Sequence, residues 1–297
     1  MSFALDKDFE DVEPVDYTQW EGQPCSIMYS EEYVSTMGIL MRLMAGEEYS
    51  ERALWLTEQG IGLLASHYSI WLYRYDILRS MYSEDEKRLE EELDWLEEIA
   101  LANQKNYQIW NYRQLIIGLF KQYNYQREFP ILAAMLDSDL KNHHVWTYRK
   151  WFVEQFDLFD NEREVQFIQQ LIETDVRNNS AWSHLFYLMF EKGDSHVKNQ
   201  IEYVKEKIAL SPQNVSAWNY LIGIYDKFKL DITELKDFCL LYVDPEVTSS
   251  MAVELLAQIY TSSKETEKAI SLYNELGDTY DPIRKNYWDY KISLIKA

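Results

Sequence analysis

Two lysines occupy equivalent points of a phrase that the sequence repeats. Lys105 begins KNYQIWNYR and Lys141 begins KNHHVWTYR, so both copies read Lys-Asn-x-x-x-Trp-x-Tyr-Arg. The next two copies carry Arg177 and Gln213 at this point. A helix cap requires the asparagine but not the lysine before it. Each lysine is therefore either a functional cation or an exposed loop residue, and the spacing alone does not decide between the two.

The other side chains that carry chemistry form no catalytic or metal-binding pattern. Histidine occurs at positions 67, 143, 144, 184 and 196, and none belongs to an HExxH or similar ligand spacing. His143 and His144 are adjacent, so their side chains point in different directions and do not favour joint metal ligation. The motifs GxxxxGKS/T, GxGxxG and GxSxG are absent. We therefore expect no metal site in this chain, and no enzyme activity of the chain on its own.

The lysines belong to a repeat that predicts helices. Tryptophan recurs with spacings of 39, 36, 36 and 36 residues, at Trp71, Trp110, Trp146, Trp182 and Trp218, and a distant copy contains Trp288. Asparagine precedes tryptophan by four residues at positions 106, 142, 178 and 214, and arginine follows it by three at positions 74, 113 and 149. On a helix the asparagine would be the N-cap, and tryptophan and arginine would share one face.

Each 36-residue unit has room for two antiparallel helices. A second helical stretch follows each phrase after a polar break, as in Phe129–Met135 and Val165–Ile172, and further hairpins are predicted at Glu31–Ala65 and Met251–Leu276. Strand signals are nearly absent. Because such hairpins bury their faces only against neighbours, we predict an all-α fold, an α-solenoid of repeated hairpins. The tryptophans would form its core, the arginines would bind carboxylates or carbonyls of adjacent repeats, and the acidic run Ser83–Glu98 would be a solvated helix face.

The composition limits the partners and the compartment. The 297 residues include 50 acidic and 29 basic side chains, a formal net charge of −21. This charge argues against binding to nucleic acid or anionic membranes and favours basic partners. Only two isolated cysteines are present, no apolar run is long enough to span a membrane, and the first residues lack the features of a signal peptide. The expected location is the cytoplasm.

The repeated phrase resembles that of the α subunits of protein prenyltransferases, and more closely the α subunit shared by farnesyltransferase and geranylgeranyltransferase type I. The resemblance extends to IMYSEEY at 27–33, YSERALWLT at 49–57 and DPIRKNYWDY at 281–290, so it spans nearly the whole chain. Among members of the family, the sequence resembles those of fungi. It implies an extended N-terminal segment at 1–30 and a single helical-repeat domain at 31–297, a crescent wrapped around a β subunit.

The resemblance also implies an activity for that heterodimer. It would transfer a farnesyl or geranylgeranyl group from its diphosphate to the cysteine of a C-terminal CaaX motif, in proteins such as small GTPases. Zinc would be bound by the β subunit and not by this chain, and any requirement for magnesium would depend on the same partner.

Seven residues match site residues of this family. Lys105 matches the catalytic lysine, which would meet negative charge as it develops on the diphosphate leaving group. Tyr107 and Tyr68 match tyrosines on the substrate side, and Gln108 matches a glutamine that hydrogen-bonds the C-terminal carboxylate of the peptide.

The other three matches lie in the following repeat. Asn142, His143 and His144 match an Asn-Tyr-His of the family, so His143 departs from the usual tyrosine. Its imidazole could still donate a hydrogen bond near the diphosphate.

Two alternatives use similar architecture. The α subunit of Rab geranylgeranyltransferase has the same repeats, but the acidic segment before the first hairpin and the tail at 281–290 disfavour it. A tetratricopeptide scaffold that binds peptides without catalysis is disfavoured by the 36-residue period and by the Asn-x-x-x-Trp-x-x-Arg pattern.

Overall fold

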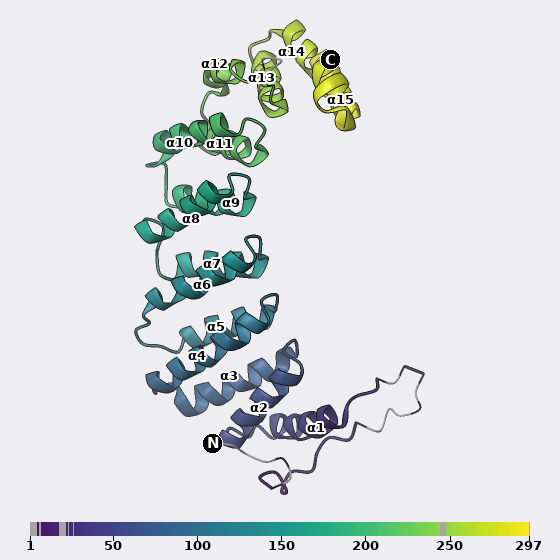
Figure 1. The fold of residues 1–297 in the computed structure, drawn as a ribbon, viewed down its shortest axis with the longest axis vertical. Coiled ribbons are helices and arrows are strands. Elements are labelled where there is room, and N and C mark those ends of the chain that lie inside the picture. The colour runs from purple at the N-terminus through teal and green to yellow at the C-terminus, as the bar shows by residue number, and fades with distance from the viewer. Residues whose placement is uncertain are drawn as a thin grey trace. The chain divides into compact units, whose positions relative to one another are not determined.

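The computed structural model describes residues 5, 7–17, 22, 24, 25, 27–243 and 248–296. Helices follow one another throughout these residues, and no strand occurs among them (Figure 1). The helices are α1 Glu31–Ala45, α2 Glu51–Leu63, α3 Tyr68–Tyr82, α4 Glu86–Ala102, α5 Tyr107–Ile117, α6 Glu128–Ser138, α7 His143–Gln155, α8 Glu162–Thr174, α9 Asn179–Phe190, α10 Val197–Leu210, α11 Val215–Phe228, α12 Lys236–Leu240, α13 Ser250–Ser262, α14 Thr266–Glu275 and α15 Lys285–Lys296. Short helical turns lie at η2 Tyr125–Arg127, η3 Ile232–Leu235, η4 Leu276–Tyr280 and η5 Pro282–Arg284.

The helices form the predicted hairpins within two compact units, Met1–Arg149 and Lys150–Ala297. The two helices of a hairpin contact each other in α1 and α2 and in α3 and α4 of the first unit, and in α13 and α14 of the second. The second helix of one repeat also packs on the first helix of the next, α4 on α5 in the first unit, and α8 on α9 and α10 on α11 in the second. The helices that carry the repeated phrase also lie side by side, α3 with α5 and α9 with α11. The all-α prediction of repeated hairpins is confirmed. The predicted N-terminal segment at 1–30 lies partly outside the described residues.

The asparagine of the phrase makes two kinds of hydrogen bond. Its Oδ1 caps the helix that follows: Asn106 accepts from the Gln108 N–H at 2.7 Å, and Asn214 accepts from the Ser216 N–H at 3.1 Å. At positions 106, 142 and 214 its Nδ2 donates to a carbonyl of the preceding repeat, as from Asn106 to Ala65 at 2.7 Å. The predicted caps are confirmed. The second bond favours asparagine over aspartate, because an ionised aspartate would supply the acceptor without the donor.

The tryptophans are core residues, as predicted, with one exception. Those at positions 71, 110, 182, 218 and 288 are buried, whereas Trp146 is half-buried. The indole N–H of Trp71, Trp146, Trp182 and Trp218 donates to the carbonyl six residues earlier, at 2.7–2.9 Å. This bond satisfies the polar end of a large ring whose apolar body is in the core.

Buried ion pairs join the helices of the first unit. Glu92 of α4 accepts hydrogen bonds from Nε and Nη2 of Arg74 of α3, both at 2.7 Å. It also accepts from the Tyr112 hydroxyl of α5 at 2.7 Å. The guanidinium continues to the Leu54 carbonyl of α2 at 3.0 Å. One carboxylate therefore connects helices of two successive repeats, and the predicted carboxylate and carbonyl partners of this arginine are confirmed.

The same arrangement recurs one repeat later. Glu128 of α6 accepts from two guanidinium nitrogens of Arg113 at 2.8 Å, from the Tyr148 hydroxyl at 2.8 Å, and from the Tyr123 hydroxyl. Burial alone would raise the pKa of the Glu128 carboxyl, but the guanidinium and the two hydroxyls outweigh it and lower that pKa. The carboxylate is therefore ionised and paired in the core.

The second unit contains contacts of the same kind. Glu164 Oε1 lies 3.0 Å from His184 Nε2, and Gln200 Oε1 accepts from the Tyr220 hydroxyl at 2.7 Å. Leu185 stands at the point of the repeat that Arg113 occupies in the first unit. A neutral amide at position 200 therefore avoids the cost of a buried carboxylate without its guanidinium.

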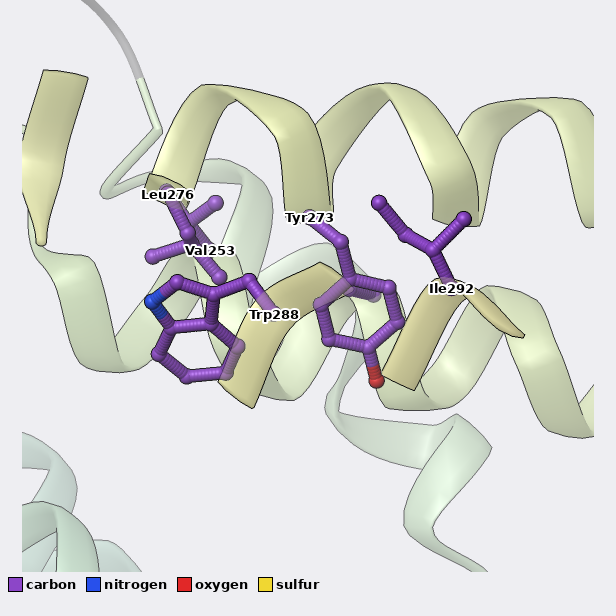
Figure 2. Close-up of a cluster of buried hydrophobic side chains, with 6 residues drawn as sticks. Val253, Tyr273, Leu276, Trp288 and Ile292 are labelled. Carbon is purple, nitrogen blue, oxygen red and sulfur yellow. The ribbon is translucent and has the colours of Figure 1, made fainter. Parts of the chain in front are cut away.

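The C-terminal helices close on a cluster of apolar side chains. Trp288 of α15 stacks on Tyr273 of α14, with ring centroids 6.0 Å apart, and Val253, Leu276 and Ile292 pack around them (Figure 2). Three helices contribute to this core, so α15 completes the hairpin of α13 and α14.

An N-terminal strap, residues 7–17, is docked on the first hairpin. The Phe9 side chain is buried, and the Arg52 guanidinium lies 5.4 Å from its ring centroid. The same guanidinium donates to both carboxylate oxygens of Asp11, at 2.6 and 2.9 Å. The strap therefore covers part of the first hairpin.

Candidate functional site

The residues predicted for the site lie in the first unit, at the N-terminal ends of three helices. Tyr68 begins α3, Tyr107 begins α5, and His143 begins α7. The loop before α5 contains Lys105, and the first turns of the helices contain Gln108 and His144. The loop before α7 contains Asn142. Because these helices are the first helices of successive repeats, the matching loops come to the same edge of the hairpins.

Four of these side chains are exposed: Lys105, Tyr68, Tyr107 and His143. The exposed fraction is 76% for Lys105, 70% for Tyr68 and 62% for Tyr107. Because these large side chains are exposed at the N-terminal ends of helices, they are available to a ligand or a partner chain.

Lys105 contacts the next repeat through one ion pair. Its Nζ lies 3.4 Å from Asp139 Oδ2, in the loop between α6 and α7. Asp139 Oδ1 accepts the backbone N–H of Lys141 at 3.1 Å, which fixes the carboxylate. The Lys141 ammonium itself forms no ion pair with the described residues of its unit. The two lysines of the repeated phrase therefore have different surroundings.

Two further hydrogen bonds join the loops that carry these groups. The buried Asn142 side chain donates from Nδ2 to the Gln104 carbonyl at 3.0 Å, and its Oδ1 accepts from the His144 N–H at 3.0 Å. The Ser138 hydroxyl donates to Gln104 Oε1 at 3.3 Å. Both amide ends of Asn142 are thus engaged, so this residue holds the two loops in register.

The aromatic groups of the site meet between α5 and α7. The rings of Tyr107 and His144 are perpendicular, with centroids 4.1 Å apart, and the His143 ring centroid lies 5.8 Å from that of His144. Burial, together with the nearby charges of His143 and Lys105, lowers the pKa of the His144 imidazole. At neutral pH His144 is therefore uncharged and offers one donor and one acceptor.

An open groove of about 660 Å³ lies beside the loop before α5, and Asn142, His143 and His144 are not among its lining residues. It is lined by Ser66 and by residues 101–108, so Lys105, Tyr107 and Gln108 face one space. Tyr68 is not among the lining residues, although it follows Ser66 by two positions. An ammonium, a phenol and an amide at one groove are suited to binding an anionic ligand.

The sequence did not reveal Asp139 as part of this group. The sequence pattern that could have indicated Asp139 is Asp-x-Lys-Asn at 139–142, which recurs as Asp-x-Arg-Asn at 175–178. An aspartate two residues before the lysine reads as an ordinary turn residue. Its contact with a lysine 34 positions earlier depends on the stacking of the repeats.

The described part of the chain contains no cluster of three or more His, Cys, Asp or Glu side chains that could hold a metal ion. None of its helices is long and apolar enough to cross a membrane.

Comparison with known proteins identifies the repeat. Residues 89–120, 125–156 and 161–191 match the model of the protein prenyltransferase alpha subunit repeat. The chain is 53% identical to the protein farnesyltransferase/geranylgeranyltransferase type-1 subunit alpha of Candida albicans, over 98% of each chain. It also matches a solved structure of Candida albicans protein geranylgeranyltransferase-I complexed with GGPP, with a TM-score of 0.91, 51% identity, and coverage of 97% of this chain and 98% of that chain.

The two alternatives have less support. The geranylgeranyl transferase type-2 subunit alpha of Candida albicans is 32% identical over 34% of this chain and 30% of its own length. The repeat model that matches is a prenyltransferase model, which disfavours a tetratricopeptide scaffold. The relationship to the type-1 protein, in contrast, extends from one end of the chain to the other. This chain belongs to the family of protein farnesyltransferase/geranylgeranyltransferase type-1 α subunits, and so is a subunit of a protein prenyltransferase.

Proposed function

We propose that this chain assembles with a β subunit in the cytoplasm, and that the heterodimer transfers a farnesyl or geranylgeranyl group from its diphosphate to the cysteine of a C-terminal CaaX motif. Small GTPases are the expected targets. The observation that carries this proposal is the full-length similarity to a type-1 α subunit, combined with the exposed Lys105 ammonium at an open groove. Residues 31–297 would act as one helical-repeat domain, with 1–30 as its N-terminal segment.

Lys105 would act on the leaving group. In the transfer a bond forms between the cysteine sulfur and the first carbon of the isoprenyl chain, while the bond from that carbon to the diphosphate oxygen breaks. The electron pair of the broken bond stays with the diphosphate, which gains negative charge. An ammonium already placed beside that oxygen stabilises the transition state more than the ground state.

Tyr68, Tyr107 and Gln108 would face the substrates. Gln108 lies in the first turn of α5, with its backbone N–H bonded to the Asn106 side chain at 2.7 Å, and it lines the groove. Its side-chain amide can donate to the C-terminal carboxylate of the acceptor peptide. The phenol rings of the two tyrosines would supply apolar area and one hydroxyl each.

His143 and His144 would complete the diphosphate side. The imidazole of His144 can donate one hydrogen bond in its neutral form, and an imidazole at position 143 can do the same where the family has a tyrosine hydroxyl. Asn142 would contribute by holding the loop of Lys105 against the loop of the histidines, through its bond to the Gln104 carbonyl.

The metal requirement is assigned to the partner. The described residues of this chain offer no set of metal ligands. On the similarity to the type-1 α subunit, we propose that zinc belongs to the β subunit and that any need for magnesium follows that subunit as well.

Co-expression with a type-1 β subunit tests the proposal. We expect a 1:1 heterodimer that contains zinc and transfers an isoprenyl group to a CaaX peptide, whereas this chain alone transfers none. Pairing the chain in turn with a farnesyltransferase β subunit and a type-I geranylgeranyltransferase β subunit would show which diphosphate each assembly uses. A chain that stays monomeric beside both β subunits, with no change in melting temperature, would contradict the proposal.

A further inference from the structure

The surroundings of Asp139 differ from those of an ordinary loop aspartate. Its backbone N–H bonds to the Met135 carbonyl at 3.1 Å as α6 ends, and its Oδ1 accepts the Lys141 N–H at 3.1 Å. The carboxylate is thus held by its own loop, with Oδ2 directed to the Lys105 ammonium at 3.4 Å. The side chain is 32% exposed, against 76% for Lys105. A fixed anion therefore contacts a mobile cation.

We propose that Asp139 is a positioning residue, which holds the Lys105 ammonium at the groove formed by Ser66 and residues 101–108. This inference rests on the function proposed for Lys105. It adds a residue of the following repeat to the site, and it gives a role to a contact that neither the caps nor the core of the hairpins requires.

The physical reason lies in the side chain of lysine. Its four-carbon stem has many rotamers, and an exposed ammonium samples most of them unless a partner restricts it. A carboxylate on one side of the ammonium restricts this motion. The ammonium has three N–H donors, so one can face Asp139 while the others remain free for oxygens of the diphosphate.

The Asp139 carboxylate, which attracts the Lys105 ammonium, should repel the isoprenoid diphosphate. Its negative charge repels the diphosphate, and so it weakens ground-state binding of the isoprenoid diphosphate. Replacing Asp139 with asparagine keeps the acceptor for the Lys141 N–H but removes the charge. We therefore expect tighter diphosphate binding together with slower transfer, a combination that a simple loss of folding would not produce.

The experiment uses the reconstituted heterodimer and compares two matched variants. Asp175 is the equivalent residue of the next repeat and accepts the Arg177 N–H at 2.9 Å, so Asp175→Asn reproduces the loop change away from Lys105. Asp139→Asn should lower the single-turnover transfer rate by about tenfold, because a misplaced catalytic group is costly, and lower the Kd for the isoprenoid diphosphate by about twofold. Asp175→Asn should change neither quantity.

A double mutant tests whether Asp139 acts through Lys105. In a Lys105→Ala background the substitution Asp139→Asn should have no further effect on the rate, because the ammonium that it positions is absent. If Asp139→Asn hinders assembly, Asp139→Glu is used as the test variant in its place, because it keeps the charge and moves it by one methylene. The transfer rate should still fall in Asp139→Glu and should be unchanged in its control, Asp175→Glu.

The results separate this inference from the proposed function. If Lys105→Ala transfers at the normal rate, the role of Lys105 fails and the role of Asp139 with it. If Lys105→Ala is slow but the Asp139 variants behave like the Asp175 variants, only the positioning role is overturned. A full effect of Asp139→Asn in the Lys105→Ala background would also overturn it.

Discussion

The Lys105 ammonium lies 3.4 Å from Asp139 Oδ2, so the lysine of one repeat is paired with the loop that begins the phrase of the next. Lys141 stands at the same point of that next phrase, and only its backbone N–H contacts the carboxylate. Two residues that are identical in sequence context therefore differ in their contacts.

This difference predicts unequal effects of alanine substitution. Lys105→Ala should slow single-turnover transfer on the order of 100- to 1,000-fold, about 3–4 kcal/mol, because one preorganised donor to the leaving group is lost. Assembly with the β subunit and binding of zinc should be unchanged. Lys141→Ala, the matched control, should cost roughly tenfold or less. Equal losses in the two variants, or a loss of assembly in Lys105→Ala, would remove the assignment.

The buried pair of Arg113 and Glu128 predicts a dependence of stability on pH. The pKa of Glu128 is lowered in the folded chain, so its stabilising contribution is present above its unfolded pKa and is lost as pH falls through the folded pKa. Glu128→Gln should destabilise the chain at pH 7 by about 3–5 kcal/mol, because it leaves a buried guanidinium without this carboxylate. Below about pH 4.5 the melting temperature of Glu128→Gln should fall less steeply than that of the wild type, because the variant has no carboxylate to protonate at this position.

The opposite substitution in the second unit supplies the control. Gln200→Glu places a carboxylate in the core where the repeat has Leu185 in place of an arginine. Burial should raise the pKa of this new carboxyl, so the variant should be least stable at neutral pH and should recover as pH falls. Melting curves between pH 4 and 8 would measure both variants, and parallel curves would contradict the assignment of charge to Glu128.

The asparagine of the phrase predicts that aspartate is a poor substitute. Asn214→Asp keeps the cap to the Ser216 N–H but loses the Nδ2 bond to the Val176 carbonyl, and it places a carboxylate oxygen against that carbonyl. We expect a loss of about 1–3 kcal/mol in chemical denaturation. Asn161 caps α8 through the Glu164 N–H, and its Nδ2 donates to no carbonyl of another repeat among the residues that the structure describes. Asn161→Asp should therefore be neutral, and a similar cost at both positions would show that the cap alone matters.

Two glycines predict opposite responses to alanine. Gly38 of α1 lies against Val15 of the N-terminal strap, and the Val15 N–H donates to the Gly38 carbonyl at 3.0 Å. A Cβ added to Gly38 would lie 3.0 Å from the Val15 carbonyl oxygen. Gly38→Ala should displace the strap and destabilise the chain by about 1–3 kcal/mol. Gly62 of α2 has open space around it, so Gly62→Ala should stabilise by about 0.5 kcal/mol. Melting temperature and the rate of proteolysis in the strap would report both effects, and equal melting temperatures would exclude close packing at Gly38.

The amino-acid sequence by itself determined the repeat, its hairpins, the caps and most of the core. These features are local: an asparagine four residues before a tryptophan both starts a helix and sets the face that it buries, whatever lies beyond the repeat. The resemblance in the phrase at 105–113 also predicts a catalytic role for one of two lysines at equivalent points of the repeat, and the alanine substitutions test this prediction.

Only the tertiary structure decided which groups meet across repeats. The carboxylate partner of Arg113 lies 15 residues later in the second helix of the same hairpin, where it also meets the Tyr148 hydroxyl of the next repeat, and the anion beside Lys105 lies 34 residues away. The period of the sequence gives equivalent positions but not contacts, because a contact depends on the distance and angle at which one hairpin stacks on the next. Side chains of several turns on each helix set that stacking together, and no single phrase contains them.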